Sequence, residues 1–349
     1  MSMSLEIAGR KIGHAHEPYV ICEISGNHNG SLERALKLME AAAATGADAI
    51  KLQTYTPDTM TIDHDGPGFR IEGGLWDGRT LYDLYREAHT PFEWHEDLFA
   101  KGRDLGVTVI STPFDETAAD LLEQLGAPAF KIASFEAVDL PLIAHVAGKG
   151  KPMIISTGMC NLGEISAAVK TARDNGCQDL ILLHCVSSYP AASEDSNVRT
   201  VPHLAAAFDC VAGLSDHTFS PAAAIASIAL GGAVIEKHFT LARADGGPDA
   251  AFSLEPAEFT SLVEDCKSAW RALGTVSYDL LGSERGSVVF RRSLYVVENI
   301  PKGGEFTKQN VRSIRPGYGL APRHLPEVIG KHAKRAIKRG ESVQWGMVK

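Results

Sequence analysis

The chain has 349 residues and a net charge of -9, because 43 Asp and Glu outnumber 34 Lys and Arg. Its hydrophobic content of 44% is typical of a folded globular protein rather than a disordered chain. The acidic balance and the lack of a basic stripe argue against nucleic-acid binding. No apolar run approaches the roughly 20 residues that span a bilayer, and the N-terminus does not resemble a signal sequence. We therefore expect a cytoplasmic enzyme or binding protein that does not associate with membranes.

The cysteines are scattered, without a CxxC pair that would indicate a zinc or redox site. Such cysteines are typical of small buried side chains in a reducing compartment. We expect this role for Cys22, which lies within an apolar run. A disulfide framework is not expected.

Apolar runs alternate with helical patterns along most of the chain, after an opening segment (residues 1–18) that could form a hairpin. Eight such alternations over about 250 residues predict a (β/α)8 TIM barrel, with a doubly wound open sheet as the alternative. The predicted strands are residues 19–25, 49–54, 107–113, 129–134, 153–158, 180–188, 211–217 and 233–240.

Two segments depart from this repeat. Residues 55–106 are far longer than a barrel loop requires, and long loops of this kind often carry function. The barrel is predicted to cover residues 19–275, followed by a linker at 276–285. Residues 286–349 then show short strands and turns, which predict a separate small β-rich domain.

The strand ends carry the chemistry, because the C-terminal ends of barrel strands converge on one mouth. Strand alternation places Ser215 with His217, and Glu236 with His238, on common faces. Two imidazoles on neighbouring strands predict a divalent metal site at His217 and His238, with open positions for water and substrate. Glu236 could instead orient a ligand.

Two lysines and a set of hydroxyl groups at other strand ends predict a site for a small dianion. The residues are Lys51, Lys131, Ser134, Ser156, Ser187 and Ser215. Glu23, at the end of the first strand, could be a general acid or base, or could form a structural ion pair with Lys51.

The motifs "ISGNHNGSLERALKLMEAAAATGADAIKLQTY", "STPFD", "FKIAS", "STGM", "GLSDHT", "IEKHFT" and "GPDAAFSLEP" occur in order along the chain. Together they resemble the sialic acid synthases. The segments "RRSLY" and "SIRPGYGL" resemble the antifreeze-like (SAF) domain of that family. The segments "KLQTYTPDTMT" and "LYDLYREAHTPFEWH" are most similar to its pseudaminic acid synthases.

The resemblance implies that phosphoenolpyruvate condenses with an acetamido sugar aldehyde, 2,4-diacetamido-2,4,6-trideoxy-L-altrose, to give a nine-carbon 2-keto acid and phosphate. It implies Mn²⁺ or Mg²⁺ on His217 and His238, and adds Thr112 to the phosphoenolpyruvate site. Ser187 stands where neuraminate synthases have Asn. Glu23 would handle water or proton transfer. The implied sugar contacts are Gln53, Tyr189, Asp249 and Arg315, the last from the partner subunit of a domain-swapped homodimer.

Other functions remain open from the sequence. Within the family, the alternatives are N-acetylneuraminate and legionaminate synthases. A Schiff-base aldolase or lyase could use Lys131, because barrel aldolases also carry a strand-end lysine. A third interpretation is a C-terminal binding module on a barrel without catalytic activity.

Overall fold

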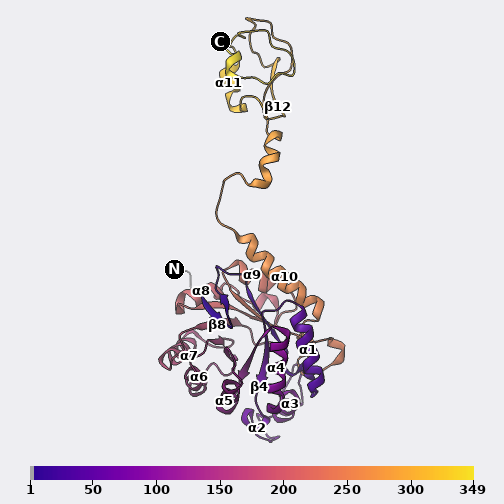
Figure 1. Cartoon of the computed structure of the whole chain (residues 1–349), viewed down its shortest axis with the longest axis vertical. Coiled ribbons are helices and arrows are strands. Elements are labelled where there is room, and N and C mark those ends of the chain that lie inside the picture. Colours follow the sequence, from indigo (N-terminus) through magenta and orange to yellow (C-terminus); the bar gives the residue numbers. More distant parts are fainter. Residues whose placement is uncertain (1–3) are drawn as a thin grey trace. The chain divides into compact units, whose positions relative to one another are not determined.

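The computed structural model describes residues 4–349 and divides into two compact units, one ending at Gly274 and the other spanning Thr275–Lys349. Figure 1 shows the strands and helices of both units along the chain. Within residues 4–349, no helix combines the length and the apolar character that crossing a membrane would need.

The first unit is a closed eight-stranded parallel barrel, which confirms the predicted fold over the open sheet. Pairing of the first and last barrel strands closes it, with Val234 opposite Tyr19 and His238 opposite Glu23. Several strands end one to three residues earlier than predicted. The strands are β3 (Tyr19–Glu23), β4 (Ala49–Thr54), β5 (Thr108–Pro113), β6 (Phe130–Ile132), β7 (Met153–Ser156), β8 (Leu180–Cys185), β9 (Val211–Asp216) and β10 (Val234–His238).

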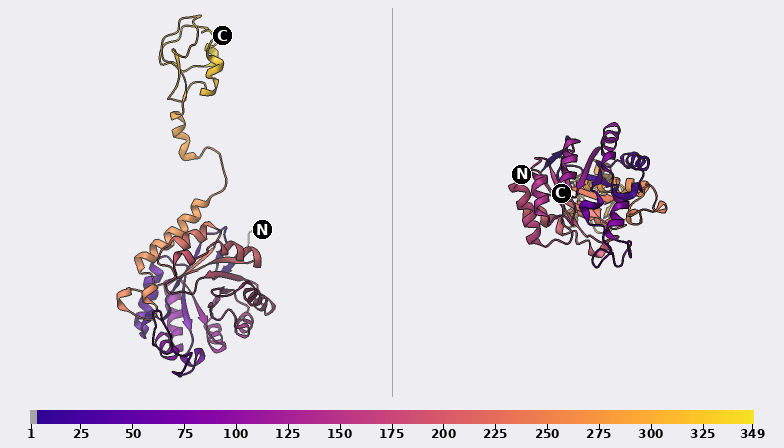
Figure 2. Two further views of the ribbon diagram at one scale, coloured as in Figure 1. Left: turned by 180° about the vertical axis from the view of Figure 1, so that it is seen from behind. Right: turned by 90° about the horizontal axis from the view of Figure 1, so that it is seen from below.

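Helices surround the barrel (Figure 2). Many begin at a side chain that caps the free amide groups of the first turn, as Ser31, Asp115 and Asn161 do. The helices that follow the barrel strands are α1 (Leu32–Ala44), α4 (His95–Leu105), α5 (Glu116–Gln124), α6 (Leu140–Ala147), α7 (Leu162–Asp174), α8 (Thr200–Phe208), α9 (Ala222–Ala229) and α10 (Pro256–Leu273).

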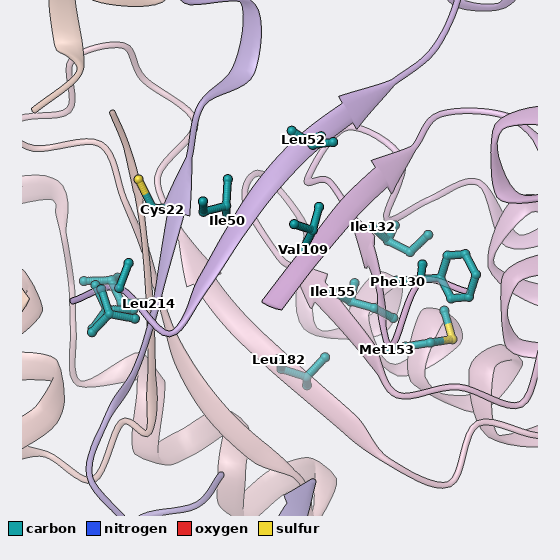
Figure 3. Packing of buried hydrophobic residues seen from close by; sticks show 14 of the residues in the cluster. Cys22, Ile50, Leu52, Val109, Phe130, Ile132, Met153, Ile155, Leu182 and Leu214 are labelled. Carbon is teal, nitrogen blue, oxygen red and sulfur yellow. The ribbon is translucent and has the colours of Figure 1, made fainter. Parts of the chain in front are cut away.

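The main core lies between the strands and these helices. Outward-facing strand residues such as Cys22, Ile50 and Leu182 belong to this buried cluster (Figure 3). Burying a leucine or isoleucine side chain such as Ile50 or Leu182 contributes about 1.5–3 kcal/mol. The expected core position of Cys22 is confirmed.

The interior of the barrel is apolar at one end and polar at the other. Inward-facing residues near the strand starts, including Tyr19, Ile21 and Val234, form a second buried cluster. The hairpin of β1 (Leu5–Ile7) and β2 (Arg10–Ile12) packs into this cluster and covers that end; residues 1–3 of the predicted hairpin segment lie outside the described residues. Polar side chains are left for the opposite end, where the strands terminate.

The long segment after β4 is largely ordered into short elements. It contains α2 (Pro57–Met60), α3 (Leu81–Ala88) and η2 (Phe92–Trp94) before α4 begins. Between α2 and α3, the backbone doubles back on itself, with Arg70 bridged to Thr80.

The second unit has its own core, built around Leu294, Val296, Phe306 and Val343. It contains one two-stranded sheet and several isolated bridges, so turns make up more of it than strands do. The predicted linker, residues 276–285, overlaps the start of η6. The elements are η6 (Gly282–Phe290), β11 (Ser293–Val296), β12 (Val311–Ile314), η7 (Pro322–His324), α11 (Leu325–Val328) and η8 (Trp345–Met347).

Candidate active site

Four charged side chains meet inside the barrel where the strands end. Lys51 Nζ lies 2.5 Å from Glu23 Oε2 and 3.1 Å from Glu236 Oε1. Lys131 Nζ lies 3.7 Å from the same Glu236 oxygen. All four are buried, and burial of this kind is costly unless each charge is compensated. Two carboxylates and two ammonium groups compensate each other here.

The charged residues of this cluster shift one another's pKa values in different directions. Burial would lower the pKa of Lys51, but the Glu23 and Glu236 carboxylates outweigh this and raise it. Burial would raise the pKa of Glu236, but Lys131 and Lys51 lower it to about 2. Burial raises the pKa of Glu23 although Lys51 opposes the shift. Glu23 is therefore the carboxyl of the pair that takes up a proton more readily.

Lys131 differs from Lys51 because it has one carboxylate neighbour rather than two. Burial lowers the pKa of Lys131 to about 8, although Glu236 opposes the shift. A bound dianion would supply the negative charge that its surroundings lack.

Hydroxyl groups line the same end of the barrel. Ser215 Oγ donates to Glu236 Oε1 at 3.1 Å, and Lys51 Nζ donates to Thr112 Oγ1 at 3.3 Å. Ser156 Oγ is buried without a hydrogen-bond partner among the described residues, so it is available to a ligand. The hydroxyl groups predicted from the sequence are those of Thr112, Ser134, Ser156, Ser187 and Ser215.

Gly158 allows two of these serines to come together. Its backbone N–H donates to Ser134 Oγ at 3.1 Å. A side chain at this position would place its Cβ 2.3 Å from Ser187 Oγ and 2.8 Å from Ser134 Oγ. Only glycine fits without moving both hydroxyl groups.

The two predicted metal ligands are neighbours. The ring centroids of His217 and His238 are 5.4 Å apart. His217 Nδ1 is 2.9 Å from the Val186 carbonyl oxygen, which it can reach as a donor, so its Nε2 keeps a free lone pair. His238 Nδ1 is buried without a hydrogen-bond partner among residues 4–349. Burial lowers the pKa of His238 well below its usual value, which favours the neutral imidazole that metal ligation requires. Burial would also lower the pKa of His217, but its contact with Cys185 raises that pKa instead, so a cation bound there would have to displace a proton from His217.

These observations fit a divalent cation held by two imidazoles. Within the part of the chain that the structure describes, no group of three or more His, Cys, Asp or Glu side chains could hold a metal ion. Further ligands would therefore come from water, substrate or other oxygen atoms, which is the open arrangement of a catalytic site.

An aromatic wall stands beside the histidines. The ring of Tyr189 lies 4.4 Å from that of His217, and the ring of Phe252 lies 4.9 Å from that of His238. Trp76, from the long segment after β4, packs against both Tyr189 and Phe252. Elsewhere in the same segment, Phe69 packs on His64, and the Tyr82 hydroxyl contacts Asp58.

The remaining predicted sugar contacts lie in different places. Gln53 and Asp249 are both half-buried, Gln53 on β4 and Asp249 in the loop after β10, where burial raises the pKa of Asp249. Arg315 is exposed in the second unit, directly after β12. The structure thus brings together the predicted charged, hydroxyl and histidine residues of the barrel. It does not place Arg315 relative to them.

Lys237, between the two inward residues Glu236 and His238, has a structural role. It faces outward, where its Nζ lies 2.6 Å from Asp216 Oδ2 and also contacts the Thr218 carbonyl oxygen. The alternation of the strand separates the structural ion pair of Lys237 from the polar end of the barrel.

Comparisons with known proteins identify the family of this chain. Residues 38–278 match the NeuB family, and residues 291–349 match the SAF domain. The chain belongs to the NeuB family. A pseudaminic acid synthase from Campylobacter jejuni is 42% identical to this NeuB-family chain, over 94% of it and 96% of the relative. An N,N'-diacetyllegionaminic acid synthase from Legionella pneumophila is 34% identical, over 94% of the chain and 93% of the relative.

A solved structure resembles this NeuB-family fold. The N-acetylneuraminic acid synthetase of Leptospira borgpetersenii, determined with citrate, has a TM-score of 0.74 and 28% identity. The match covers 82% of this chain and 96% of the other. The resemblance to sialic acid synthases that the sequence motifs indicated is therefore confirmed.

Two further residues near the polar end of the barrel are absent from the predicted set. Burial raises the pKa of Glu136, just after β6, to about 7, and its Oε2 has no hydrogen-bond partner among the described residues. Cys185 Sγ lies 3.8 Å from His217 Nδ1 and 3.8 Å from Ser187 Oγ. The sequence signals were available, since Glu136 lies two residues after Ser134, and Cys185 has the inward parity of Ser187.

Proposed function

We propose that this protein is a pseudaminic acid synthase that joins phosphoenolpyruvate to 2,4-diacetamido-2,4,6-trideoxy-L-altrose. The observation that carries the proposal is the meeting of Lys51, Lys131, the ring of hydroxyl groups and the His217/His238 pair at one barrel end. The similarity to the Campylobacter enzyme is higher than to the legionaminic acid synthase, which favours this sugar within the family. Because phosphoenolpyruvate is made in the cytoplasm, we place the enzyme there.

The proposed reaction forms one carbon–carbon bond and releases phosphate. C3 of phosphoenolpyruvate attacks the aldehyde carbon of the sugar, and the aldehyde oxygen takes up a proton. Water adds to C2 and loses one proton, which leaves a hydroxyl group on C2. The bond between C2 and the phosphate oxygen then breaks, and the hydroxyl proton passes to the departing phosphate as the C2 carbonyl group forms. The products are a nine-carbon 2-keto acid and inorganic phosphate, so atoms and electrons balance.

Lys51 and Lys131 bind the phosphate and carboxylate of phosphoenolpyruvate, because they are the buried cations of the site. The hydroxyl groups of Thr112, Ser134, Ser156, Ser187 and Ser215 orient those groups as hydrogen-bond donors. Glu23 exchanges a proton with the water that adds to C2, for which its raised pKa is suited.

The sugar lies on the histidine side of the site in this proposal. His217 and His238 hold Mn²⁺ or Mg²⁺, and the cation supplies Lewis-acid polarisation of the aldehyde oxygen. Gln53, Tyr189 and Asp249 contact the sugar, and Glu236 keeps both lysines charged through its ion pairs.

The direct test is to incubate the purified protein with phosphoenolpyruvate and a panel of acetamido sugars, with and without Mn²⁺ or Mg²⁺. We expect metal-dependent release of one phosphate for each nine-carbon acid formed, fastest with the diacetamido-trideoxy-altrose. Faster turnover of N-acetylmannosamine or of the legionaminate precursor would reassign the enzyme within its family.

Replacement of Lys131 by alanine is expected to raise the KM for phosphoenolpyruvate more than the KM for the sugar, because its charge pairs with the anion. In the unaltered enzyme, the Lys131 ammonium group has a pKa of about 8, so it loses its proton above that pH. The value of kcat/KM for phosphoenolpyruvate should therefore fall above about pH 8, and Lys131→Ala should remove this limb of the profile. Equal KM changes for both substrates would count against the assignment.

A Schiff-base aldolase is the second candidate function, because Lys131 is buried and has a lowered pKa, as amine nucleophiles require. Borohydride trapping in the presence of a 2-keto acid distinguishes the two. A covalent adduct at Lys131 would support the aldolase, whereas phosphate release without an adduct supports the synthase.

We also propose that two chains form a domain-swapped dimer. The unit Thr275–Lys349 holds 14 of the 34 Lys and Arg but only 6 of the 43 Asp and Glu, so it carries +8 and leaves -17 on the remainder. Opposite charges of this size favour association of the C-terminal unit with an acidic barrel, and salt should weaken it. The second unit also exposes Phe290 (60%) and Tyr318 (66%), which a partner could cover.

In this dimer, Arg315 completes the sugar site of the partner subunit. Neither Arg315→Ala nor His217→Ala homodimers should be active. Mixing the two variants should restore about a quarter of the activity, because half of the dimers are mixed and each mixed dimer has one intact site. Subunit exchange is checked with differently tagged chains. No recovery despite exchange would place Arg315 in the site of its own subunit or outside catalysis.

A further inference from the structure

The long segment after β4 ends in an ordered hairpin tip, residues 72–78. Below the tip, Ile71 N donates to Arg79 O and Leu81 N donates to Phe69 O, both at 2.9 Å. Gly73 and Gly78 have φ angles of 78° and 79°, which side chains rarely adopt. These hydrogen bonds and glycine turns fix the backbone of the tip, so a side chain that the tip carries has a defined position.

That side chain is Trp76. Its indole N–H donates to the carbonyl oxygen of Pro248 at 2.8 Å, which joins the hairpin tip to the loop after β10. Its ring lies 5.9 Å from the ring of Tyr189 and 6.4 Å from that of Phe252. The adjoining tip residue Leu75, by contrast, is 48% exposed.

Trp76 continues the aromatic wall away from the histidines. Tyr189 and Phe252 contact His217 and His238, and Trp76 contacts Tyr189 and Phe252. In the proposed reaction, the aldehyde carbon reacts beside the histidines, so a sugar that lies along this wall would bring its remote carbons to Trp76. Asp249, a proposed sugar contact, directly follows the Pro248 that Trp76 binds.

Resting on the proposed function, we infer that Trp76 is a specificity-determining residue, which contacts the end of the sugar remote from its aldehyde. The proposed sugar has an acetamido group at C4 and a methyl group at C6, whereas N-acetylmannosamine has hydroxyl groups at both positions. An indole face favours methyl groups and offers no partner for the hydroxyl groups, which lose their hydration against it. Trp76 therefore selects the 6-deoxy, 4-acetamido sugar.

The first test compares kcat/KM for these two sugars at saturating phosphoenolpyruvate. Trp76→Ala should reduce the preference for the diacetamido sugar by about 10- to 200-fold, the usual range for contacts of this kind in an apolar pocket. Trp76→Phe keeps an aromatic ring but removes the hydrogen bond to Pro248. The preference for the diacetamido sugar should therefore fall by about two- to tenfold. Leu75→Ala, in the same tip, is the matched control and should keep the preference. The KM for phosphoenolpyruvate should not change.

The second test is independent of turnover. Titrating the protein with the diacetamido sugar, in the absence of phosphoenolpyruvate, should change its tryptophan fluorescence. Trp76→Phe should abolish that change, while Trp270→Phe should keep it, since Trp270 bonds to His14 at the apolar end of the barrel.

The outcomes separate the two proposals. No phosphate release from the unaltered protein with any acetamido sugar would refute the proposed reaction. An active enzyme in which Trp76→Ala lowers kcat/KM equally for both sugars, with a melting temperature like that of Leu75→Ala, would overturn the role of Trp76. Retention of the full fluorescence change in Trp76→Phe would also overturn it.

Discussion

Replacing His217 or His238 by alanine is expected to abolish sugar acid formation while the barrel stays folded. Each ring contributes a free lone pair to the proposed metal site, and neither belongs to the apolar clusters of the barrel. Mutation of a residue that only supports a metal ligand usually lowers metal affinity or activity by about 10- to 100-fold. Loss of a ligand itself should therefore lower them at least as much. Phosphate release and calorimetric Mn²⁺ binding measure the two effects separately.

His203→Ala is the matched control, because His203 is exposed on α8 and outside the site. It should retain activity and metal binding. If both site variants kept wild-type activity, and chelation left the unaltered enzyme active, the metal assignment would be wrong.

Replacing Lys51 by methionine is expected to lower both activity and stability severely. The substitution removes the cation that lies between Glu23 and Glu236, and leaves two buried carboxylates with only Lys131 nearby. Removing one partner of a buried ion pair typically costs about 3–5 kcal/mol. Urea unfolding at pH 7 measures the loss in free energy of unfolding. Lys37→Met removes a pair that is largely exposed on α1, so it should have little effect.

The loss in free energy of unfolding that Lys51→Met causes at pH 7 should become smaller as the pH is lowered. Burial holds the pKa of Glu23 above its usual value already in the unaltered protein, and removing Lys51 raises it further. A carboxyl whose folded-state pKa exceeds its unfolded value takes up a proton more readily when folded, so lowering the pH stabilises the folded variant relative to neutral pH. A deficit that stays constant as the pH falls through this raised pKa would mean that charge repulsion is not its cause.

Charge and alternation explain why much of the barrel site was predictable. Along β10, a period of two separates the inward Glu236 and His238 from the outward Lys237 before any contact is known. The barrel then requires the inward residues at strand ends to meet, and the structure brings Lys51, Lys131 and the two histidines together there. The roles given to these residues in catalysis stay predictions.

Residues in loops were harder to assign. Trp76 lies far along the chain from Thr54, where β4 ends, and no periodicity predicts that the hairpin tip brings it to Tyr189 and Phe252. Glu136 and Cys185 lie close to predicted residues, but their significance comes from burial and neighbours, which sequence does not display.

The sequence by itself determined the barrel, the separate C-terminal segment and the strand-end residues, because hydrophobic periodicity and strand parity are local properties of the chain. Only the tertiary structure decided which charges pair, since Glu236 serves both Lys51 and Lys131 across separate strands. It likewise decided which hydroxyl groups remain free and which aromatic rings reach the histidines. Those properties depend on distances between segments far apart in the chain, where a difference of about 1 Å separates a hydrogen bond from none.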